Sequence, residues 1–441
     1  MKISATLART GGQRRTAAPL LRMAAAMLAA GLLACAVTQV AIAAPPKGAC
    51  SNPEPGRPTV RLLPWAQDLL GAERVWPQTT GAGVIVAVVD SGVDADHPQL
   101  RRPGKVLRGE DFFQVGSLPG NFDCVSHGTA VAGIIAAEPV PGVGFHGIAP
   151  GATILPVRVT DREAGEGESA RSIDPTVLAQ GIVYAVDHGA RVINLSLSGG
   201  RDDKPVRQAV AYAVRRDVVV VAAAGNRQTD GSAHRPSFPA SYPGVLGVGA
   251  ISISGARTSG SQTGDYVDLV APGDGVLSTT RRSGHMYLSG TSFATPFVSA
   301  AAALVRSAWP KLTAAEVIQR LKATAVPARG GSGSDGYGAG VVDPYRAVIE
   351  GMPAKATHVP AAAETPPDAQ ALAARTWWRT AGTDAQALTT VSLVAVAVLA
   401  IVACVLAAGR RRRWAPSRRP AITQPRKDPD VLPEHLFGRS S

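Results

Sequence analysis

The feature that most constrains the fold of this chain is a series of five short apolar runs, rich in Val, Ile, Leu and Ala. None of them alternates apolar with polar residues, as a strand with one face in water would. Continuous runs are typical of strands covered on both faces, as in a parallel sheet between two layers of helices. The runs predict strands at residues 83–90, 153–159, 190–197, 218–224 and 244–250.

Segments with helical spacing of apolar residues alternate with these runs. Such alternation predicts an α/β fold, with a mostly parallel sheet and helices on both of its faces. The sequence contains no internal repeat. The predicted helices are residues 127–137, 176–188, 204–215, 292–308 and 313–325.

The formal net charge of +12 belongs to the two ends of the chain. Residues 1–43 carry five basic and no acidic side chains, and residues 386–441 carry nine basic and three acidic ones. Residues 44–385 are almost neutral, with 31 basic and 30 acidic side chains. A nucleic-acid-binding protein would need a basic face on its folded part, so this distribution argues against nucleic acid as a partner.

Both ends have the pattern of membrane-targeting segments. Residues 1–43 have an Arg-bearing start, a long apolar stretch and small residues at Ala41 and Ala43, which predict a cleaved signal peptide. An uncleaved anchor helix and lipoprotein processing at Cys35 are the alternatives. Near the other end, residues 387–409 are long and apolar enough to span a membrane.

Four arginines, Arg410–Arg413, follow that apolar segment directly. A basic cluster marks the cytoplasmic side of a transmembrane helix, so residues 410–441 are predicted to be cytoplasmic and the rest extracytoplasmic. The alternative for 387–409 is a buried core helix. Residues 44–81 form a predicted N-terminal arm, 82–350 the main domain, and the Ala/Pro-rich residues 351–386 a linker to the membrane.

Four positions combine a reactive or polar side chain with the end of a predicted element. Asp90 ends the first strand, where parallel sheets build their sites, and His127 opens a helix. Ser292 also lies at a helix start, where its N–H can support an oxyanion, and Pro296 falls in the predicted first turn. Asn226 follows the strand 218–224 and presents an amide donor. Taken singly, these residues equally suit turns and helix caps.

An Asp, a His and a Ser in this chain order, with an Asn between the last two, are the parts of one nucleophilic catalyst. Their segments are "VAVVDSGVDADHPQL", "SHGTAVAGIIAA", "AAAGN" and "GTSFATPFVSAAAALV". Over residues 60–350 the chain resembles the subtilases, the subtilisin-like serine proteases. The resemblance implies Ser292 as nucleophile, His127 as general base and then acid, and Asp90 as the group that orients His127. The Asn226 amide and the Ser292 N–H would bind the oxyanion.

The resemblance also implies where an extended peptide would bind. The segment "INLSLSGG" is similar to the subtilase strand that pairs with substrate, except that Ser198 stands where glycine is common. Either Ser198 narrows the pocket before the scissile bond, or the segment shifts so that Gly199 takes that place. The implied substrate-binding residues are Ser196, Leu197, Ser198, Gly199, Ala224 and Gly225.

The arm is too short for the folding-assisting prodomain that secreted subtilases usually carry. Outside the predicted signal peptide and membrane helix, the chain has two cysteines, Cys50 and Cys124. A pair of cysteines in an exported domain predicts a disulfide bond, which would tie the arm to the loop before His127. Free thiols are the alternative. A metal-binding or catalytic Cys124 is disfavoured, because no second Cys/His pair supports zinc and Ser292 already supplies a nucleophile.

The order of these parts resembles that of the mycosins, the membrane-anchored subtilases associated with type VII secretion. This resemblance implies limited proteolysis of secreted polypeptides, with the secretion membrane complex as a partner. The alternatives are a scaffold of that complex with secondary protease activity, and a general degradative protease at the cell surface. Subtilases often bind calcium, but this sequence has no dense Asp/Asn ligand cluster, so we expect no metal or other cofactor.

Overall fold

The computed structural model describes residues 49–351 except for 51, 115–117, 162–172, 229–234, 330 and 332, together with Leu406 and Arg410. The predicted signal peptide and nearly all of the predicted linker, membrane helix and tail lie outside these residues. Within the described residues, no helix combines the length and the apolar character needed to cross a membrane.

A seven-stranded parallel sheet forms the centre of the domain. The five predicted strands are confirmed: four are shorter than predicted by one to four residues, and the fifth has the predicted length but is shifted by one residue. The two edge strands were not predicted: β2 has only two residues, and β7 contains an apolar run of only three residues, 269–271. Their order across the sheet is β2 (Glu110–Asp111), β3 (Thr153–Arg158), β1 (Ile85–Asp90), β4 (Val192–Leu195), β5 (Val219–Ala223), β6 (Val245–Ile251) and β7 (Leu269–Pro272).

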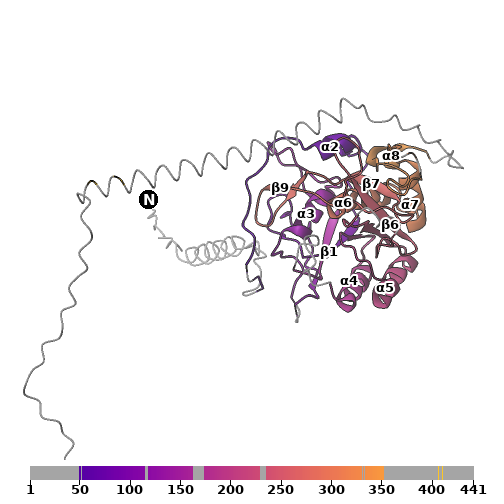
Figure 1. Ribbon diagram of the computed structural model, residues 1–441, viewed down its shortest axis with the longest axis horizontal. Helices are drawn as coiled ribbons and strands as arrows, with labels where there is room; N and C mark the ends of the chain where they lie inside the picture. The colour runs from indigo at the N-terminus through magenta and orange to yellow at the C-terminus, as the bar shows by residue number, and fades with distance from the viewer. Residues whose placement is uncertain are drawn as a thin grey trace, which may run out of the picture. The chain divides into compact units, whose positions relative to one another are not determined.

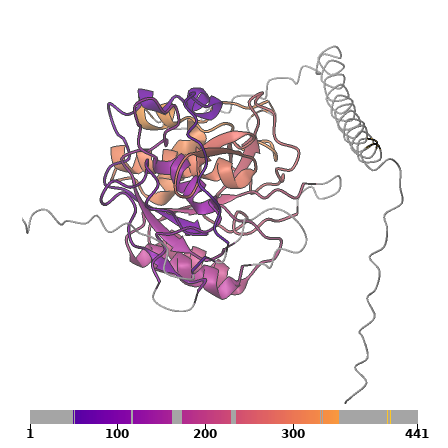
Figure 2. The same ribbon diagram turned by 90° about the vertical axis from the view of Figure 1, so that its left-hand side faces the viewer.

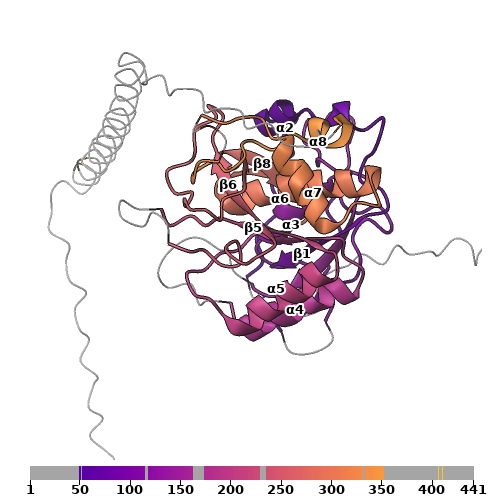
Figure 3. The same cartoon turned by 90° about the vertical axis from the view of Figure 1, so that its right-hand side faces the viewer.

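Helices cover both faces of this sheet, as predicted (Figures 1 and 3). One face packs against α4 (Pro175–Asp187) and α5 (Lys204–Arg215), which lie together below the sheet in Figure 3. The opposite face packs against α3 and α6 at its centre, with smaller helices outside them. This second layer consists of α2 (Trp65–Leu70), α3 (His127–Ala136), α6 (Thr291–Ala308), α7 (Ala314–Ala323) and α8 (Pro344–Ile349).

Helix α6 is buried along almost its whole length, from Thr291 to Arg306. Its run of alanines lets it pack against β4, β5, β6 and β7 of the sheet. Helix α3 packs beside α6. It also lies against the segment that ends at Thr279, since a Cβ at Gly133 would lie 2.1 Å from Oγ1 of that residue. The close packing of the two helices fixes the position of their first turns relative to the sheet.

A two-stranded antiparallel sheet, β8 (Val276–Thr279) and β9 (His285–Leu288), lies between α3 and the N-terminal arm. The arm runs along the segment that leads into β9, on the side of the domain that faces the viewer in Figure 2. The Arg57 N–H donates to the Ser283 carbonyl at 2.8 Å, and the His285 N–H donates to the Pro58 carbonyl at 3.1 Å. The Val60 N–H donates to Nδ1 of His285 at 3.1 Å.

Two buried histidines at this contact make the unfolding free energy sensitive to acid. Burial lowers the pKa of His97 and that of His285 from 6.5 to about 4. Between these values the unfolded chain binds a proton that the folded chain does not. Protonation of the unfolded chain at these histidines therefore does not reduce the free energy of unfolding above pH 6.5, and it reduces this free energy progressively as the pH falls towards 4.

We expect the His285→Gln variant to lose part of this dependence, by up to about 1.4 kcal/mol per pH unit between pH 6 and 4.5. Urea unfolding of the full-length protein across this range, followed by tryptophan fluorescence, measures the slope. Carboxylates also change the slope, and the raised pKa of Asp123 acts in the opposite direction. Both proteins contain the same carboxylates, so their contributions cancel in the difference between the two slopes. An identical slope in both proteins would contradict the prediction.

Candidate active site

Three neighbouring strands of the sheet end at the same edge and are followed by predicted site residues. The order β1–β4–β5 places Asp90, the segment after Leu195 and the segment after Ala223 side by side. Ligand sites of open parallel sheets form at the carboxyl ends of the strands, especially where the strand order changes. Helices α3 and α6 begin at this same edge, with His127 as the first residue of α3 and Ser292 as the second of α6.

Asp90 and His127 form a buried pair. The Oδ1 atom of Asp90 lies 2.7 Å from Nδ1 of His127, and both side chains are at most 5% exposed. The N–H of Ser91 donates to the same oxygen at 2.7 Å, which holds the carboxylate in place. A carboxylate at Nδ1 favours the tautomer with its proton there, so Nε2 is left to accept a proton.

The loop before His127 is held by contacts that the sequence did not predict. Ser126 has a left-handed backbone (φ = 65°), a strained conformation for a residue with a side chain. The N–H of Arg281 donates to Oγ of Ser126 at 3.1 Å, and Nε of Arg281 donates to the Asp123 carbonyl at 3.0 Å. These long-range contacts fix the direction in which the chain enters α3, and hence the orientation of His127.

Asp123 is a fully buried carboxylate behind the Asp90–His127 pair. It accepts hydrogen bonds from the Ser91 hydroxyl, the Val125 N–H, and the N–H and hydroxyl of Thr129, at 2.6 to 3.0 Å. Burial raises the pKa of Asp123 to about 6, although the hydrogen bonds from Thr129 and Val125 act to lower it. Asp123 thus ties the end of β1 to the first turn of α3.

The first turn of α3 is also capped from β1. The Gly128 N–H donates to the Ser91 hydroxyl at 2.9 Å, and a Cβ on Gly128 would lie 2.0 Å from the Gly92 carbonyl oxygen. Only glycine therefore lets the helix start so close to Asp90. The caps of this helix come from Ser91 and Asp123, and His127 itself does not act as a cap.

The start of α6 explains how the Ser292 backbone is supported. Pro296 was predicted in the first turn, but the helix begins at Thr291, so Pro296 lies in the second turn. Proline has no N–H to donate to the carbonyl four residues earlier, which is that of Ser292. The hydroxyl of Ser196 donates to this carbonyl instead, at 2.6 Å. Ser196 is held in turn by Nδ2 of Asn194 at 2.9 Å.

Asn226 lies beside Ser292 with the orientation of its amide fixed by Thr291. The Oδ1 atom of Asn226 accepts from the Thr291 N–H at 2.8 Å and from the Thr291 hydroxyl at 3.0 Å. With the amide oxygen held in this way, the NH₂ group is left to face the pocket. Gly290 lies against this group, since a Cβ there would be 3.1 Å from Nδ2 of Asn226.

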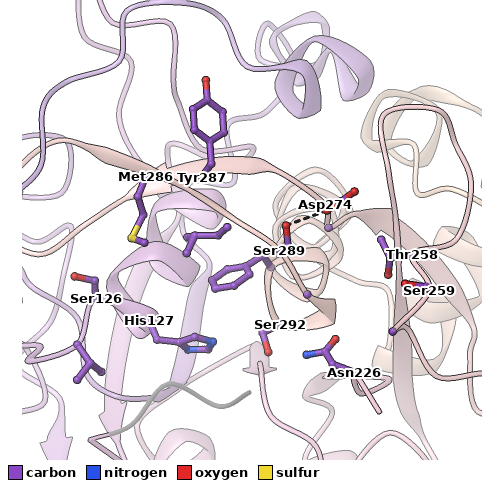
Figure 4. Close-up of a pocket in the computed structure, with 16 residues that line it drawn as sticks. Ser126, His127, Asn226, Thr258, Ser259, Asp274, Met286, Tyr287, Ser289 and Ser292 are labelled. Atoms are coloured by element: carbon purple, nitrogen blue, oxygen red, sulfur yellow. Dashed lines mark hydrogen bonds between the residues drawn. The ribbon is translucent and has the colours of Figure 1, made fainter. Parts of the chain in front are cut away.

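His127, Asn226 and Ser292 line one pocket, of about 480 Å³ (Figure 4). The His127 ring points towards Ser292, and the Ser292 hydroxyl lies between that ring and the Asn226 amide. Strand β9 and the residues after it form the opposite wall. The lining residues are Val125, Ser126, His127, Asn226, Thr258, Ser259, Gly260, Gly273, Asp274, Met286, Tyr287, Leu288, Ser289, Gly290, Ser292 and Phe293.

The implied substrate-binding residues lie outside this pocket, next to it. Ser196 and Leu197 are buried, so any contact of Ser196 with a substrate would come from its backbone, because its hydroxyl supports Ser292. Both backbone polar groups of Gly199 bond to Phe238, at 2.8 and 2.7 Å.

The two implied substrate-binding segments, which contain Ser198 and Gly225, lie next to each other. Gly225 follows the buried Ala224 and has a positive φ of 101°. A Cβ on Gly225 would lie 2.2 Å from Oε1 of Gln262 and 3.2 Å from the Ser198 hydroxyl, so the segments that contain Ser198 and Gly225 lie side by side.

Cys50 and Cys124 form a disulfide bond, with their Cα atoms 5.5 Å apart. The Glu54 N–H donates to the Cys124 carbonyl at 3.0 Å, which extends the attachment of the arm. No described residue of the arm lines the pocket that contains Ser292. The arm therefore supports the loop before His127 and leaves the described pocket open.

Sequence reasoning missed two residues that hold the site together. Thr291 directly precedes Ser292 but was treated only as part of the motif. Asp123 directly precedes Cys124, and it joins Ser91, 32 residues away, to Thr129 in the predicted helix 127–137. An acidic residue between the apolar Phe122 and a cysteine, four residues before His127, was the available signal.

Comparisons with known proteins give one family. The sequence profile of the subtilase family matches residues 81–340. Thermitase from Thermoactinomyces vulgaris is 40% identical over 57% of this chain and 85% of its own length. Subtilisin E from Bacillus subtilis is 39% identical, and the match spans 61% of its length.

Mycosins match a larger share of the chain. Mycosin-1 from Mycobacterium tuberculosis is 37% identical over 66% of this chain and 74% of its own length. The crystal structure of MycP1 from Mycobacterium smegmatis is similar with a TM-score of 0.58 at 32% identity, over 72% of this chain and 95% of that one. MycP3 from the ESX-3 type VII secretion system gives a TM-score of 0.56 at 32% identity, over 69% and 97%. The chain therefore belongs to the subtilase family of serine endopeptidases and, within it, to the mycosins.

Proposed function

We propose that this protein is a membrane-anchored, extracytoplasmic serine endopeptidase that uses Asp90, His127 and Ser292 for limited proteolysis of secreted polypeptides. The observation that carries the proposal is the buried Asp90–His127 hydrogen bond of 2.7 Å, with His127 lining the same pocket as Ser292 and Asn226. This arrangement contains a nucleophile, a base that can take its proton, and a donor for the oxyanion.

In the acylation step, Nε2 of His127 takes the proton of the Ser292 hydroxyl while Oγ attacks the carbonyl carbon of the scissile peptide. The resulting oxyanion accepts hydrogen bonds from the Asn226 amide and from the Ser292 N–H. This N–H belongs to the first turn of α6, where backbone N–H groups lack acceptors within the helix. Asp90 stabilises the imidazolium that has formed.

The imidazolium then donates its proton to the leaving nitrogen, so the C–N bond breaks and an acyl-enzyme remains. Water attacks this ester, His127 takes the proton of the water, and Ser292 leaves with that proton as the carboxylic product departs. The carbonyl of Ser292 stays bonded to Ser196 throughout, so the backbone of the nucleophile keeps its position. The residues of this chain supply each group that these steps use.

We further propose an association with type VII secretion, supported by the mycosin relatives, one of which is described as an essential component of the ESX-1 system. The apolar residues 387–409 with the following arginines support a single membrane anchor with a cytoplasmic tail. Residues 351–386 would then connect the catalytic domain to the outer face of the membrane.

A fluorophosphonate probe tests the proposed nucleophile directly. Full-length protein in detergent should react at Ser292 with loss of fluoride, and peptide mapping by mass spectrometry should place the adduct there. A Ser292→Ala variant should remain unlabelled. Adduct formation at another serine, or none in folded protein, would contradict the assignment.

Thr291 gives a test of the oxyanion site. Thr291→Val removes the hydroxyl that bonds to Asn226, so the amide loses part of its fixed orientation, and we expect kcat to fall about tenfold. Thr291→Ser keeps the hydroxyl and should retain most of the activity. Peptide hydrolysis with separate kcat and KM values measures the effect, and a change in KM alone would place the role of Thr291 elsewhere.

A further inference from the structure

The pocket beside Ser292 has a distinct electrostatic character. Among the residues that line it, Asp274 is the single one with a permanent charge, and no lysine or arginine is among them. Asp274 is exposed, and in Figure 4 its side chain lies on the far side of Ser289 from His127. A positively charged group that enters this pocket would therefore meet one carboxylate and no competing cation from the lining residues.

Neighbouring groups hold this carboxylate at the pocket wall. The Ser289 hydroxyl donates to Oδ1 of Asp274 at 3.0 Å and accepts from the Gly275 N–H at 2.9 Å. Among the described residues, no lysine or arginine forms an ion pair with Asp274. The carboxylate is thus held by a neutral hydroxyl, and no basic side chain among the described residues neutralises its charge.

The position of Asp274 relative to the nucleophile follows from the backbone. The Gly290 N–H donates to the Gly273 carbonyl at 2.7 Å. Gly290 lies two positions before Ser292, and Gly273 directly precedes Asp274, so this bond holds the Asp274 segment beside the Ser292 segment. An extended peptide advances about 3.3 Å per residue. A substrate side chain within the first three residues from the cleaved bond can therefore reach the carboxylate.

The pocket lies on one side of the nucleophile, and the segments proposed to hold the acyl part of the substrate, around Ser198 and Gly225, do not line it. It is lined instead by His127, which protonates the leaving nitrogen, and by β9. We infer that Asp274 is a specificity-determining residue that selects a lysine or arginine within the first three residues after the scissile bond. This inference rests on the proposed function, because it assigns the leaving-group side of that same site.

Peptides that vary in one charge test this inference. The cleavage site is first located by mass spectrometry in a digest of an unfolded protein, and quenched peptides then carry Lys, Ala or Glu at each of the three following positions. At one of these positions we expect kcat/KM about threefold higher for Lys than for Ala and about tenfold higher for Lys than for Glu, at low salt. The Lys-to-Glu ratio of kcat/KM should shrink in 0.5 M NaCl, because salt screens the attraction between the substrate lysine and Asp274.

Two substitutions at Asp274 and one matched control assign the effect. Asp274→Asn should reduce the Lys-to-Glu ratio to about twofold or less, and Asp274→Lys should reverse it. Asp187→Asn changes the charge by the same unit at the end of α4 and keeps an acceptor for the Tyr212 hydroxyl, so the wild-type ratio should persist. Fluorophosphonate labelling checks that each variant is folded.

The outcomes separate the inference from the proposed function. Equal rates for Lys, Ala and Glu at all three positions, or a ratio that survives Asp274→Asn, would overturn the role of Asp274 while leaving a working protease. No cleavage of any peptide by a folded, full-length wild type would instead count against the proposed function, and the inference would fall with it.

Discussion

Replacement of Ser292 by alanine is expected to lower kcat for peptide hydrolysis by about 10⁶-fold, the general scale for removal of the nucleophile from such a triad. The loss follows from the geometry, because the His127 Nε2 would have no hydroxyl to deprotonate and a bound peptide would face only water. Ser292 is small and its side chain lies at the pocket, so alanine should leave the fold of α6 intact. Steady-state kinetics on a peptide cleaved by the wild type measure the change.

The same experiment becomes sharper when His127 is included. If the two residues act as one unit, His127→Ala should cost about as much as Ser292→Ala, and the double variant should lose hardly more than either one. Ser307→Ala, at the other end of α6, is a matched control that should keep the wild-type rate. Losses that add up in the double variant would show that Ser292 and His127 do not share one catalytic step.

The central part of the fold could be predicted because its sequence signals are local. The continuous apolar runs at β1, β4 and β5 need no partner to be recognised, and the small residues of α3 and α6 mark helices that lie close to a sheet. Strand β2 consists of two acidic residues, and β7 contains an apolar run of only three residues, so neither produces such a pattern. Their pairing depends on β3 and β6, which the sequence does not place beside them.

The reactive side chains could be predicted, but not the groups that hold them. Asp90, His127, Ser292 and Asn226 each stand at the end of an element, where sequence shows them directly. The bond from Ser196 to the Ser292 carbonyl joins residues 96 positions apart, and it exists because Pro296 leaves that carbonyl without a helix donor. A pairing of this kind follows only from the fold, so the sequence did not predict that the hydroxyl of Ser196 supports the Ser292 backbone.

Removal of the disulfide should produce the largest change in stability. Cys50 and Cys124 are 74 positions apart, and in the chain-entropy description closing a loop of that length contributes about 4 kcal/mol to the free energy of unfolding. The Cys50→Ser/Cys124→Ser variant is therefore expected to unfold at a clearly lower urea concentration. Intact-mass analysis with an alkylating agent should find both cysteines unmodified in the unreduced wild type.

Activity separates a supporting arm from an inhibitory one. Asp123 still ties the loop to Ser91 and Thr129 when the disulfide is removed, so the Asp90–His127 pair should persist and kcat should change less than about threefold at 25 °C. The arm also keeps its backbone bonds to Ser283 and His285, but without a covalent tie it should be trimmed faster by an added protease. A tenfold gain in kcat/KM would mean that the arm obstructs substrate, against its position outside the pocket. An unchanged urea midpoint would mean that the first residues of the arm contribute little to the folded state.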